Sequence, residues 1–293
     1  MNLTNSSKTR LSKLEQSYTW CEDFARLHNE NFTVVSWLLP KKMRPHFFSI
    51  YAFCRYTDDL GDEADGDRKA LLDAWEDEIL AAIEGDGYRP LTKALHQTIN
   101  ECSMPTEPFL RLIEANRIDQ YKQRFTNYEE LLNYCSYSAT PVGQMVLSIL
   151  GYHDVTRYEL SDATCIGLQL ANFWQDVSVD ITKGRIYIPQ EDLKRFGVTE
   201  SDIQNQKVTE SYKELMQFEV ERTRNWFRKG AGLEHTLPRN LRTDIRLFRV
   251  GGEAILNAIE DAQYDTLSNR PTIKKSEKAK IAITNLIRGL LRL

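Results

Sequence analysis

The sequence has little glycine and proline, with 14 and 9 of these residues in a chain of 293. Both residue types interrupt helices, so their scarcity leaves room for long, continuous helices. The five cysteines lie far apart and form no CxxC pair. This spacing argues against a structural zinc site or a disulfide framework and favours a reduced protein with buried thiols.

The sequence also lacks an excess of positive charge and a long apolar run. Its net charge of −4 argues against a nucleic-acid-binding protein with a broad basic surface. Residues 1–16 are polar and contain no apolar core of a signal peptide. Residues 281–293 are too short and too polar to span a bilayer, and they are expected to form either an interfacial helix or an ordinary bundle helix. We therefore expect a cytoplasmic location, with any membrane contact peripheral and at the inner face of the cytoplasmic membrane.

Helical periodicity dominates what remains. Hydrophobic residues make up 41% and charged residues 27%, a balance that supports a sizeable core. Apolar residues recur every three or four positions in residues 45–60, 71–83, 108–123, 128–150, 159–179, 211–229, 241–267 and 273–291. Residues 185–188 are the only short strand candidate. The pattern predicts an all-α fold, with residues 1–293 forming one bundle of about nine to eleven helices and no domain boundary.

The first acidic motif closes an apolar helix. Asp58 and Asp62 are four residues apart and therefore share one helix face. Two carboxylates on one face repel each other, and a hard cation relieves that repulsion. Oxygen ligands with few other donors suit magnesium, which takes the rest of its shell from water and substrate phosphates. A solvated acidic helix end is the alternative interpretation.

The second acidic motif continues a helix of apolar and small residues, 166–171. Asn172, Asp176 and Asp180 step by four and are expected to line one face. A polar stripe on a surface helix is again the alternative. Because the preceding helix is almost entirely apolar, the stripe is expected to face a cavity.

Facing each other, the two motifs would clamp a diphosphate through bridging metal ions. Basic residues should complete the clamp, since guanidinium groups match phosphate oxygens in pairs. Arg55 precedes the first motif by three residues, and Lys183 and Arg185 follow the second. These three are the predicted diphosphate-binding residues.

A third segment interrupts a predicted helix with small residues. Pro141 and Gly143 indicate a kink, which can open a groove for a long apolar chain. Tight helix packing explains the small residues equally well. Tyr134 and Tyr137 could face a developing carbocation, although core tyrosines are the simpler explanation.

These motifs resemble those of the squalene/phytoene synthase family over nearly the whole chain, roughly residues 18–291. The aspartate-rich motif of that family follows a YAFCR-like stretch, which residues 51–55 match. An RIY sequence follows its second motif, as at residues 185–187. Its YCxxxAxxVG stretch is matched by Tyr134, Cys135, Ala139, Val142 and Gly143.

The resemblance implies an isoprenoid-synthase bundle in which the two motifs face each other across a central cavity. It implies a cluster of up to three magnesium ions, held by Asp58, Asp62, Asn172, Asp176 and Asp180. It also implies that the substrate is an isoprenoid diphosphate.

Within the family, the sequence is most similar to the branch of bacterial squalene and hopanoid biosynthesis that makes hydroxysqualene. Residues 30–40, 58–64 and 172–177 have the form typical of that branch. Gln175 stands where condensing members usually carry arginine. Two diphosphates need more neutralising charge than one, so an uncharged residue here favours a reaction of a single diphosphate.

We therefore predict an enzyme that ionises presqualene diphosphate and captures the cation with water, giving hydroxysqualene and diphosphate. No NADPH is expected, because no hydride is delivered. By motif position, Tyr134, Gln169 and Gln175 are candidates to make one end of the cavity polar for that water, and Tyr187 is a further catalytic candidate. The expected partners are the enzymes that make presqualene diphosphate and that reduce hydroxysqualene.

Two alternatives stay open. A head-to-head condensing synthase, which joins two farnesyl diphosphates to presqualene diphosphate or squalene, would use the same clamp, and so would a phytoene synthase. A catalytically silent helical assembly partner is the non-enzymatic alternative, and the intact acidic motifs argue against it.

Overall fold

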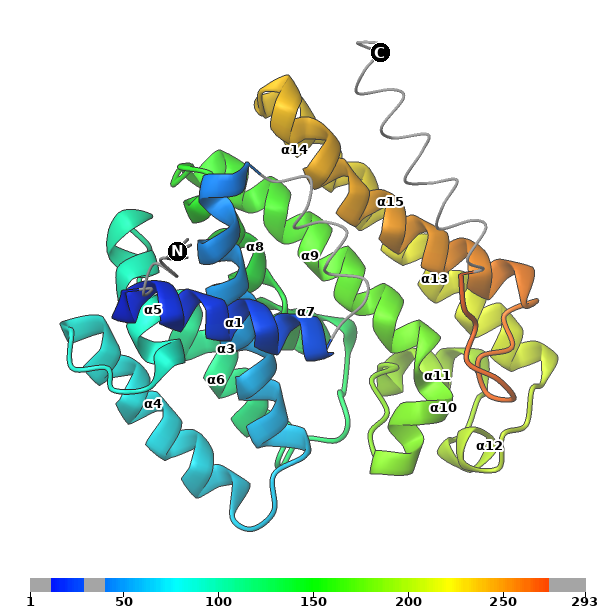
Figure 1. Ribbon diagram of the computed structural model, residues 1–293. Coiled ribbons are helices and arrows are strands. Elements are labelled where there is room, and N and C mark those ends of the chain that lie inside the picture. Colours follow the sequence, from blue (N-terminus) through cyan, green and yellow to red (C-terminus); the bar gives the residue numbers. More distant parts are fainter. Residues whose placement is uncertain (1–11, 29–39, 274–293) are drawn as a thin grey trace, which may run out of the picture.

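The computed structural model describes residues 12–28 and 40–273 (Figure 1). Every regular element in these residues is a helix, which confirms the all-α fold. The predicted helix at 273–291, and most of the branch-like opening at 30–40, lie outside the described residues. No helix in the described part of the chain is long and apolar enough to cross a membrane.

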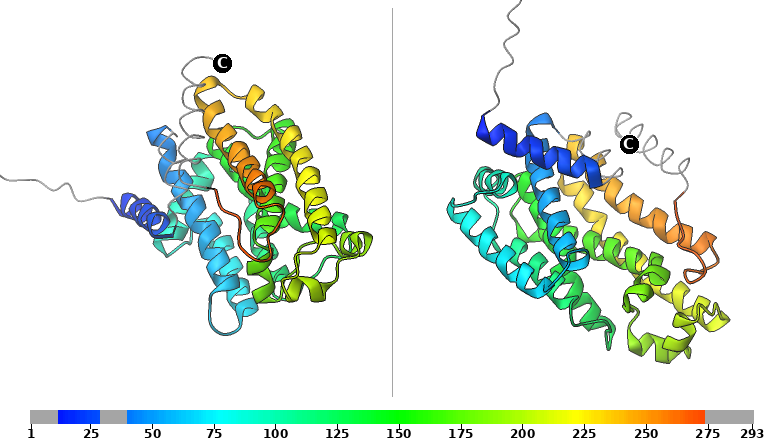
Figure 2. Two further views of the ribbon diagram at one scale, coloured as in Figure 1. Left: turned by 90° about the vertical axis from the view of Figure 1, so that its right-hand side faces the viewer. Right: turned by 60° about the horizontal axis from the view of Figure 1, so that its bottom comes forward.

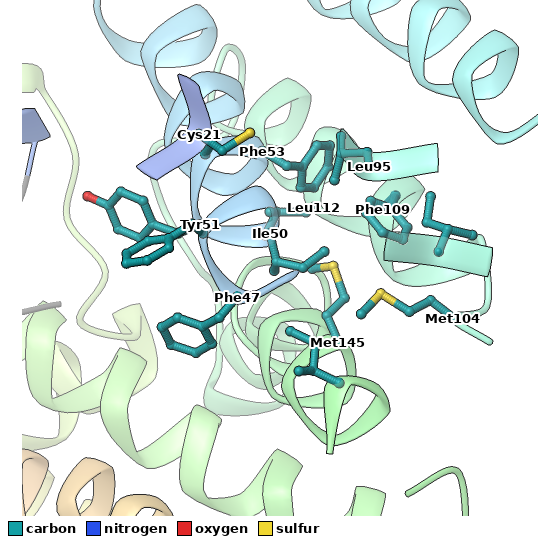
Figure 3. Close-up of a cluster of buried hydrophobic side chains, with 14 of the residues drawn as sticks. Cys21, Phe47, Ile50, Tyr51, Phe53, Leu95, Met104, Phe109, Leu112 and Met145 are labelled. Atoms are coloured by element: carbon teal, nitrogen blue, oxygen red, sulfur yellow. The ribbon is translucent and has the colours of Figure 1, made fainter. Parts of the chain in front are cut away.

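The first group of helices packs around one apolar core. Phe47, Ile50 and Phe53 of one helix meet side chains from several neighbours there (Figure 3). The helices of this group are α1 (Lys13–His28), α3 (Arg44–Asp62) with the 3-10 turn η1 (Lys41–Met43) before it, α4 (Arg68–Glu84), α5 (Pro90–Glu101), α6 (Glu107–Ile118) and α8 (Thr140–Ile149).

The second group packs around another apolar core, in which Trp174, Tyr212 and Phe227 are fully buried. Its elements are α7 (Tyr128–Ser138), α9 (Val155–Gln175), α10 (Val177–Asp180), the 3-10 turn η2 (Ile181–Lys183), α11 (Gln190–Phe196), α12 (Glu200–Gln204), α13 (Glu210–Gly230) and the end of α15 (Arg239–Asp261). Helix α14 (Gly232–Thr236) and the start of α15 instead contribute Leu233, Leu241 and Ile245 to the first core.

Helix α9 of the second group packs against α13 and α15 and also against α8 of the first group (Figure 1 and Figure 2). Small residues allow this close packing. A Cβ atom on Gly143 of α8 would lie 2.4 Å from the Ser161 hydroxyl oxygen, and one on Gly230 of α13 would lie 2.2 Å from the Thr164 hydroxyl oxygen. Larger residues at either glycine would force these helices away from α9.

Local signals in the sequence explain several helix ends. Asp67, Asn127 and Asp154 each accept a hydrogen bond from a backbone N–H in the first turn of α4, α7 and α9. Gly85 ends α4 with a positive φ of 104°, a conformation that favours glycine.

Four local predictions need correction. The pattern at 128–150 forms two helices, because Pro141 opens α8 after a break at Ala139. The pattern at 108–123 ends as a helix at Ile118. Residues 185–188 form no strand, and the N–H of Ile186 donates to the carbonyl of Gln123 at 3.1 Å. Short helices such as α10, α12 and α14 raise the number of helices above the expected nine to eleven.

Candidate active site

The first acidic motif lies at the end of α3, where α6 supports it. The Asn116 side chain donates to Asp58 Oδ1 at 3.2 Å, and the Gln120 side chain donates to the carbonyl of Gly61 at 3.0 Å. A Cβ atom on Gly61 would lie 2.3 Å from the Asn116 amide oxygen, so glycine is needed for this close approach. The packing of α6 thus positions Asp58.

The pKa of Asp58 is raised to about 6. Loss of water around the carboxylate is the main cause and the negative charge of Asp62 adds to it, while the hydrogen bond from Asn116 acts in the opposite direction. Asp58 therefore carries negative charge that its protein neighbours compensate only in part.

Asp62 bridges to the segment that follows the second motif. Lys183 Nζ donates to Asp62 Oδ2 at 2.8 Å, and Arg185 Nη2 donates to Asp62 Oδ1 at 3.0 Å. Burial opposes the ionisation of Asp62, but the hydrogen bonds and charges of these two cations outweigh it and lower the pKa of the carboxyl. The structure therefore brings three predicted site residues together from both motifs.

The carboxylate of Asp119, which the sequence did not single out, lies close to Arg185. Asp119 accepts hydrogen bonds from the hydroxyls of Tyr134 at 2.8 Å and Tyr187 at 3.4 Å, and one of its oxygens lies 4.0 Å from Arg185 Nη1. Loss of water raises the pKa of Asp119 to about 6 against the opposing charge of Arg185. Both predicted catalytic tyrosines thus donate to Asp119, and the ring of Tyr187 stacks on Phe173 at a centroid distance of 3.9 Å.

The second acidic motif is interrupted at its centre. Asp176 separates α9 from α10, although its N–H still donates to the carbonyl of Asn172 at 2.9 Å and its carbonyl accepts from Asp180 at 2.8 Å. The one-turn spacing of the three side chains is therefore kept. The Asn172 side chain is exposed.

Asp180 has no side-chain hydrogen bond to another described residue. Loss of water and the negative charge of Asp176 raise its pKa to about 7, with Arg185 and Lys183 opposing the rise. This carboxylate has the least compensated charge of the four motif aspartates.

Asp176 is paired with a residue that sequence reasoning did not single out. Arg270, in the segment after α15, forms an ion pair with Asp176 and donates to Gln175 Oε1 at 3.0 Å. Gln175 is buried, and its amide donates to the carbonyl of Pro271 at 2.6 Å. Gln175 thus holds the chain after α15 against the second motif, and Arg270 places a positive charge where none was expected.

Arg55 is the one predicted diphosphate-binding residue whose ion pairs stay within its own segment of the chain. It pairs with Asp59 at 2.6 Å and Glu63 at 2.7 Å, along its own helix. Lys183 and Arg185 instead pair with the first motif.

The donor set of the two motifs fits magnesium. Carboxylate and amide oxygens are its preferred protein ligands, and Asp58 and Asp180 hold negative charge that neighbouring cations do not balance. Within residues 12–28 and 40–273, no three acidic, histidine or cysteine side chains already form a metal-binding cluster. Lys183, Arg185 and Arg270 instead contact the carboxylate oxygens of Asp62 and Asp176 that a metal ion would use.

An apolar cavity of about 280 Å³ lies beside α9. Helices α7, α8, α9 and α15 contribute to its walls, and the interruption between α7 and α8 forms part of them, as expected for the predicted kink. Gln169 is one of its few polar residues. The other residues of the wall are Ser138, Ala139, Val142, Gly143, Val146, Leu147, Ser161, Thr164, Cys165, Leu168, Leu233, Ile245 and Phe248.

Fold and site together define an all-helical isoprenoid-synthase architecture, with two acidic motifs joined by basic residues and an apolar cavity beside α9. The chain matches the squalene/phytoene synthase family over residues 25–277. It belongs to that family.

Relatives and solved structures agree with this assignment. The chain is 31% identical over 281 residues to a phytoene synthase of Arthrospira platensis, covering 88% of this chain and 90% of that protein. Squalene synthase HpnC from Alicyclobacillus acidocaldarius is 48% identical with a TM-score of 0.84, covering 86% of this chain and 96% of that one. A dehydrosqualene synthase with a bound ligand has a TM-score of 0.88 at 23% identity, covering 96% and 99% of the two chains, and shows the fold alone.

Proposed function

We propose that this enzyme ionises presqualene diphosphate in a magnesium-dependent reaction and captures the resulting cation with water, so that it releases hydroxysqualene and diphosphate. This makes it a carbon–oxygen lyase. The observation that carries the proposal is the 48% identity to squalene synthase HpnC of Alicyclobacillus acidocaldarius over 86% of the chain, well above the 31% identity to phytoene synthase.

The charge arrangement supports the ionisation step. Lys183 and Arg185 lie against Asp62, between the two motifs, where they can transfer their hydrogen bonds to diphosphate oxygens. Asp58, Asp62, Asn172, Asp176 and Asp180 would hold the metal ions. Bound magnesium would supply the positive charge that stabilises the leaving diphosphate.

We propose that Tyr134 and Tyr187 support Arg185 through Asp119. Their hydroxyls donate to Asp119, and this carboxylate lies 4.0 Å from Arg185 Nη1, whereas Nη2 donates to Asp62. The rings of Tyr187 and Phe173 stack within the second apolar core, and this aromatic pair beside Asp119 is proposed to stabilise developing positive charge.

A condensing synthase is the second candidate, and a specific contact favours it. Arg270 contacts Gln175 and Asp176. Its guanidinium group supplies a positive charge on the side of the site where Gln175 is uncharged. The charge argument from Gln175 alone therefore no longer excludes a second diphosphate. The phytoene synthase relatives, at about 30% identity, agree with this alternative.

One experiment separates the candidates. Purified enzyme with magnesium receives either presqualene diphosphate or farnesyl diphosphate, each with and without NADPH. We expect hydroxysqualene from presqualene diphosphate in both cofactor conditions and little product from farnesyl diphosphate. Abundant presqualene diphosphate, squalene or phytoene from the prenyl diphosphate would instead establish a condensing enzyme. Unchanged product formation in cells that carry Asp176→Ala would indicate a silent assembly partner.

The proposed reaction places the enzyme between two others. A condensing enzyme must supply presqualene diphosphate, and a reductase must consume the alcohol product. Because substrate and product both carry long hydrocarbon chains, we propose peripheral contact with the cytoplasmic membrane through residues 281–293. Liposome flotation of the full chain and of a chain lacking these residues tests this, and equal flotation would contradict it.

A further inference from the structure

The apolar cavity has few polar groups, and most of them are already satisfied within the protein. The Thr164 hydroxyl donates to the carbonyl of Leu160 at 3.4 Å. Ser161 forms a side-chain hydrogen bond with Cys165. These groups have little need for a further polar partner in the cavity.

Ser138 is different. It lines the same cavity, and its hydroxyl oxygen is buried with no hydrogen-bond partner among the described residues. Most buried hydroxyls are paired, either within the protein or with an ordered water. An unpaired hydroxyl in the wall of a cavity large enough for a water molecule therefore indicates that the cavity binds water or another polar molecule there.

The break between α7 and α8 adds a second polar group at the same residue. In a continuous helix the N–H of Val142 would donate to the carbonyl of Ser138, but it donates to the carbonyl of Ala139 at 3.2 Å. Pro141 cannot take its place as a donor, because it has no N–H. The interruption thus leaves Ser138 without its regular helical partner.

Gln169 contributes from the other wall. It lines the cavity, and its side-chain amide forms no hydrogen bond with another described residue. It precedes Asn172 of the second motif by three residues on α9, so the two side chains share a helix face. Gln169 therefore lies on the stripe that leads from the cavity to the proposed leaving-group site.

We propose that Ser138 and Gln169 hold the water molecule that captures the carbocation, an inference that rests on the proposed function. As the diphosphate leaves with the bonding electron pair, an oxygen lone pair of this water forms the new carbon–oxygen bond. The proton that the resulting oxonium loses passes to the released diphosphate. The other cavity walls are apolar and keep further water away from the cation.

The test uses the full-length enzyme with presqualene diphosphate and magnesium, and measures two quantities separately. Diphosphate release reports ionisation, and the fraction of product recovered as alcohol rather than as hydrocarbon reports water capture. Ser138→Ala should leave diphosphate release within about twofold and lower the ratio of alcohol to hydrocarbon about tenfold, the effect of losing one hydrogen bond to the water. Gln169→Leu should shift the ratio in the same direction.

Thr164→Val is the matched control. It removes a hydroxyl of the same cavity at nearly constant volume, but that hydroxyl is already bonded to Leu160. Its product ratio should stay at the wild-type value. Thermal unfolding of Ser138→Ala should match the wild type, because no hydrogen bond within the protein is lost.

The outcomes distinguish the two proposals. If the wild type forms no hydroxysqualene, the proposed function fails. If the wild type forms it and Ser138→Ala keeps the wild-type ratio of alcohol to hydrocarbon, the water site is wrong while the function stands. An equal shift in Thr164→Val would attribute the change to the shape of the cavity and would also overturn the water site.

Discussion

The two acidic motifs have the same one-turn spacing but differ in how their charges are compensated. The first lies on an unbroken helix, and Asp62 is neutralised by Lys183 and Arg185 from the opposite side of the site. The second is broken at Asp176, which is neutralised by Arg270 from its own side. Asp180 has no such partner.

Aspartates with the same spacing in the sequence therefore differ in how strongly neighbouring cations already bind them. If Asp62 binds magnesium as proposed, the metal ion would compete with Lys183 and Arg185, and these two cations would then be free to bind diphosphate. At Asp180 it would displace none. Under this proposal, metal binding at the first motif would release diphosphate-binding groups, whereas Asp180 of the second motif would gain directly from a metal ion.

The largest effect is expected from removing a carboxylate of either motif. Asp58→Ala and Asp176→Ala should each lower turnover of presqualene diphosphate by at least about 100-fold, because stabilisation of the leaving charge is lost. Unfolding temperature without metal should change little. A large drop in that temperature would mean that the carboxylates are structural.

Magnesium and diphosphate together should stabilise the wild type. At 100 times the dissociation constant, binding to the folded state alone adds about 2.7 kcal/mol to its stability. Unfolding temperature should rise with both ligands present and return after EDTA. Asp62→Asn and Asp180→Asn should each reduce the rise, and a rise of full size in both variants would disprove their role as ligands.

Gln175→Leu separates two roles for this residue. If Gln175 holds the segment at Arg270 and Pro271, the variant loses two hydrogen bonds, one of them buried, and stability falls by about 1–3 kcal/mol. Urea unfolding measures this. If Gln175 instead served only the water in the cavity, stability would be unchanged and only the ratio of alcohol to hydrocarbon would fall.

The smallest effect concerns pH and Asp180. Its pKa is raised from the ordinary value of 3.8 to about 7 in the folded state, so between these values the folded protein keeps a proton that the unfolded chain has lost. Ionisation of Asp180 therefore lowers stability as pH rises, and the full cost is reached above about pH 7.

Asp180→Asn should consequently stabilise the metal-free protein at pH 8 by about 1 kcal/mol, since solvent screens part of the charge. The gain should fade as pH falls toward 4. Asp62→Asn is the contrasting variant, because its carboxylate is stabilised by two cations, and it should lower stability at pH 8. Equal effects of both variants would contradict the difference between the motifs.

Periodicity predicted most helices because their buried faces are apolar and few glycines or prolines interrupt them. The pattern at 71–83, for example, lies within α4. It did not show that Asp176 interrupts the second motif, nor that Arg270, which lies 94 residues further along the chain, pairs with Asp176. The false strand at 185–188 is an extended segment whose apolar residues are buried against α7 and α9.

Residue type and spacing singled out the acidic motifs and, as diphosphate-binding candidates, Lys183 and Arg185. They did not predict the pairing of these two cations with Asp62. They did not identify Asp119, because a single aspartate after a helix has no distinguishing spacing. The nearest pointer to this region is Asn116, three residues earlier, a polar residue on a helix face that is buried. Nor did spacing reveal the pairing of Arg55, which prefers nearby carboxylates along its own helix.

The bridge at Asp62 also bears on the order in which the chain folds. It joins residues 121 and 123 positions apart, so it forms only after a long loop has closed. Contacts within either apolar core include many at shorter separation, and those are the ones that a folding transition state forms first. Variants at Asp62, Lys183 or Arg185 should therefore change the rate at which the protein unfolds and leave the rate of folding nearly untouched.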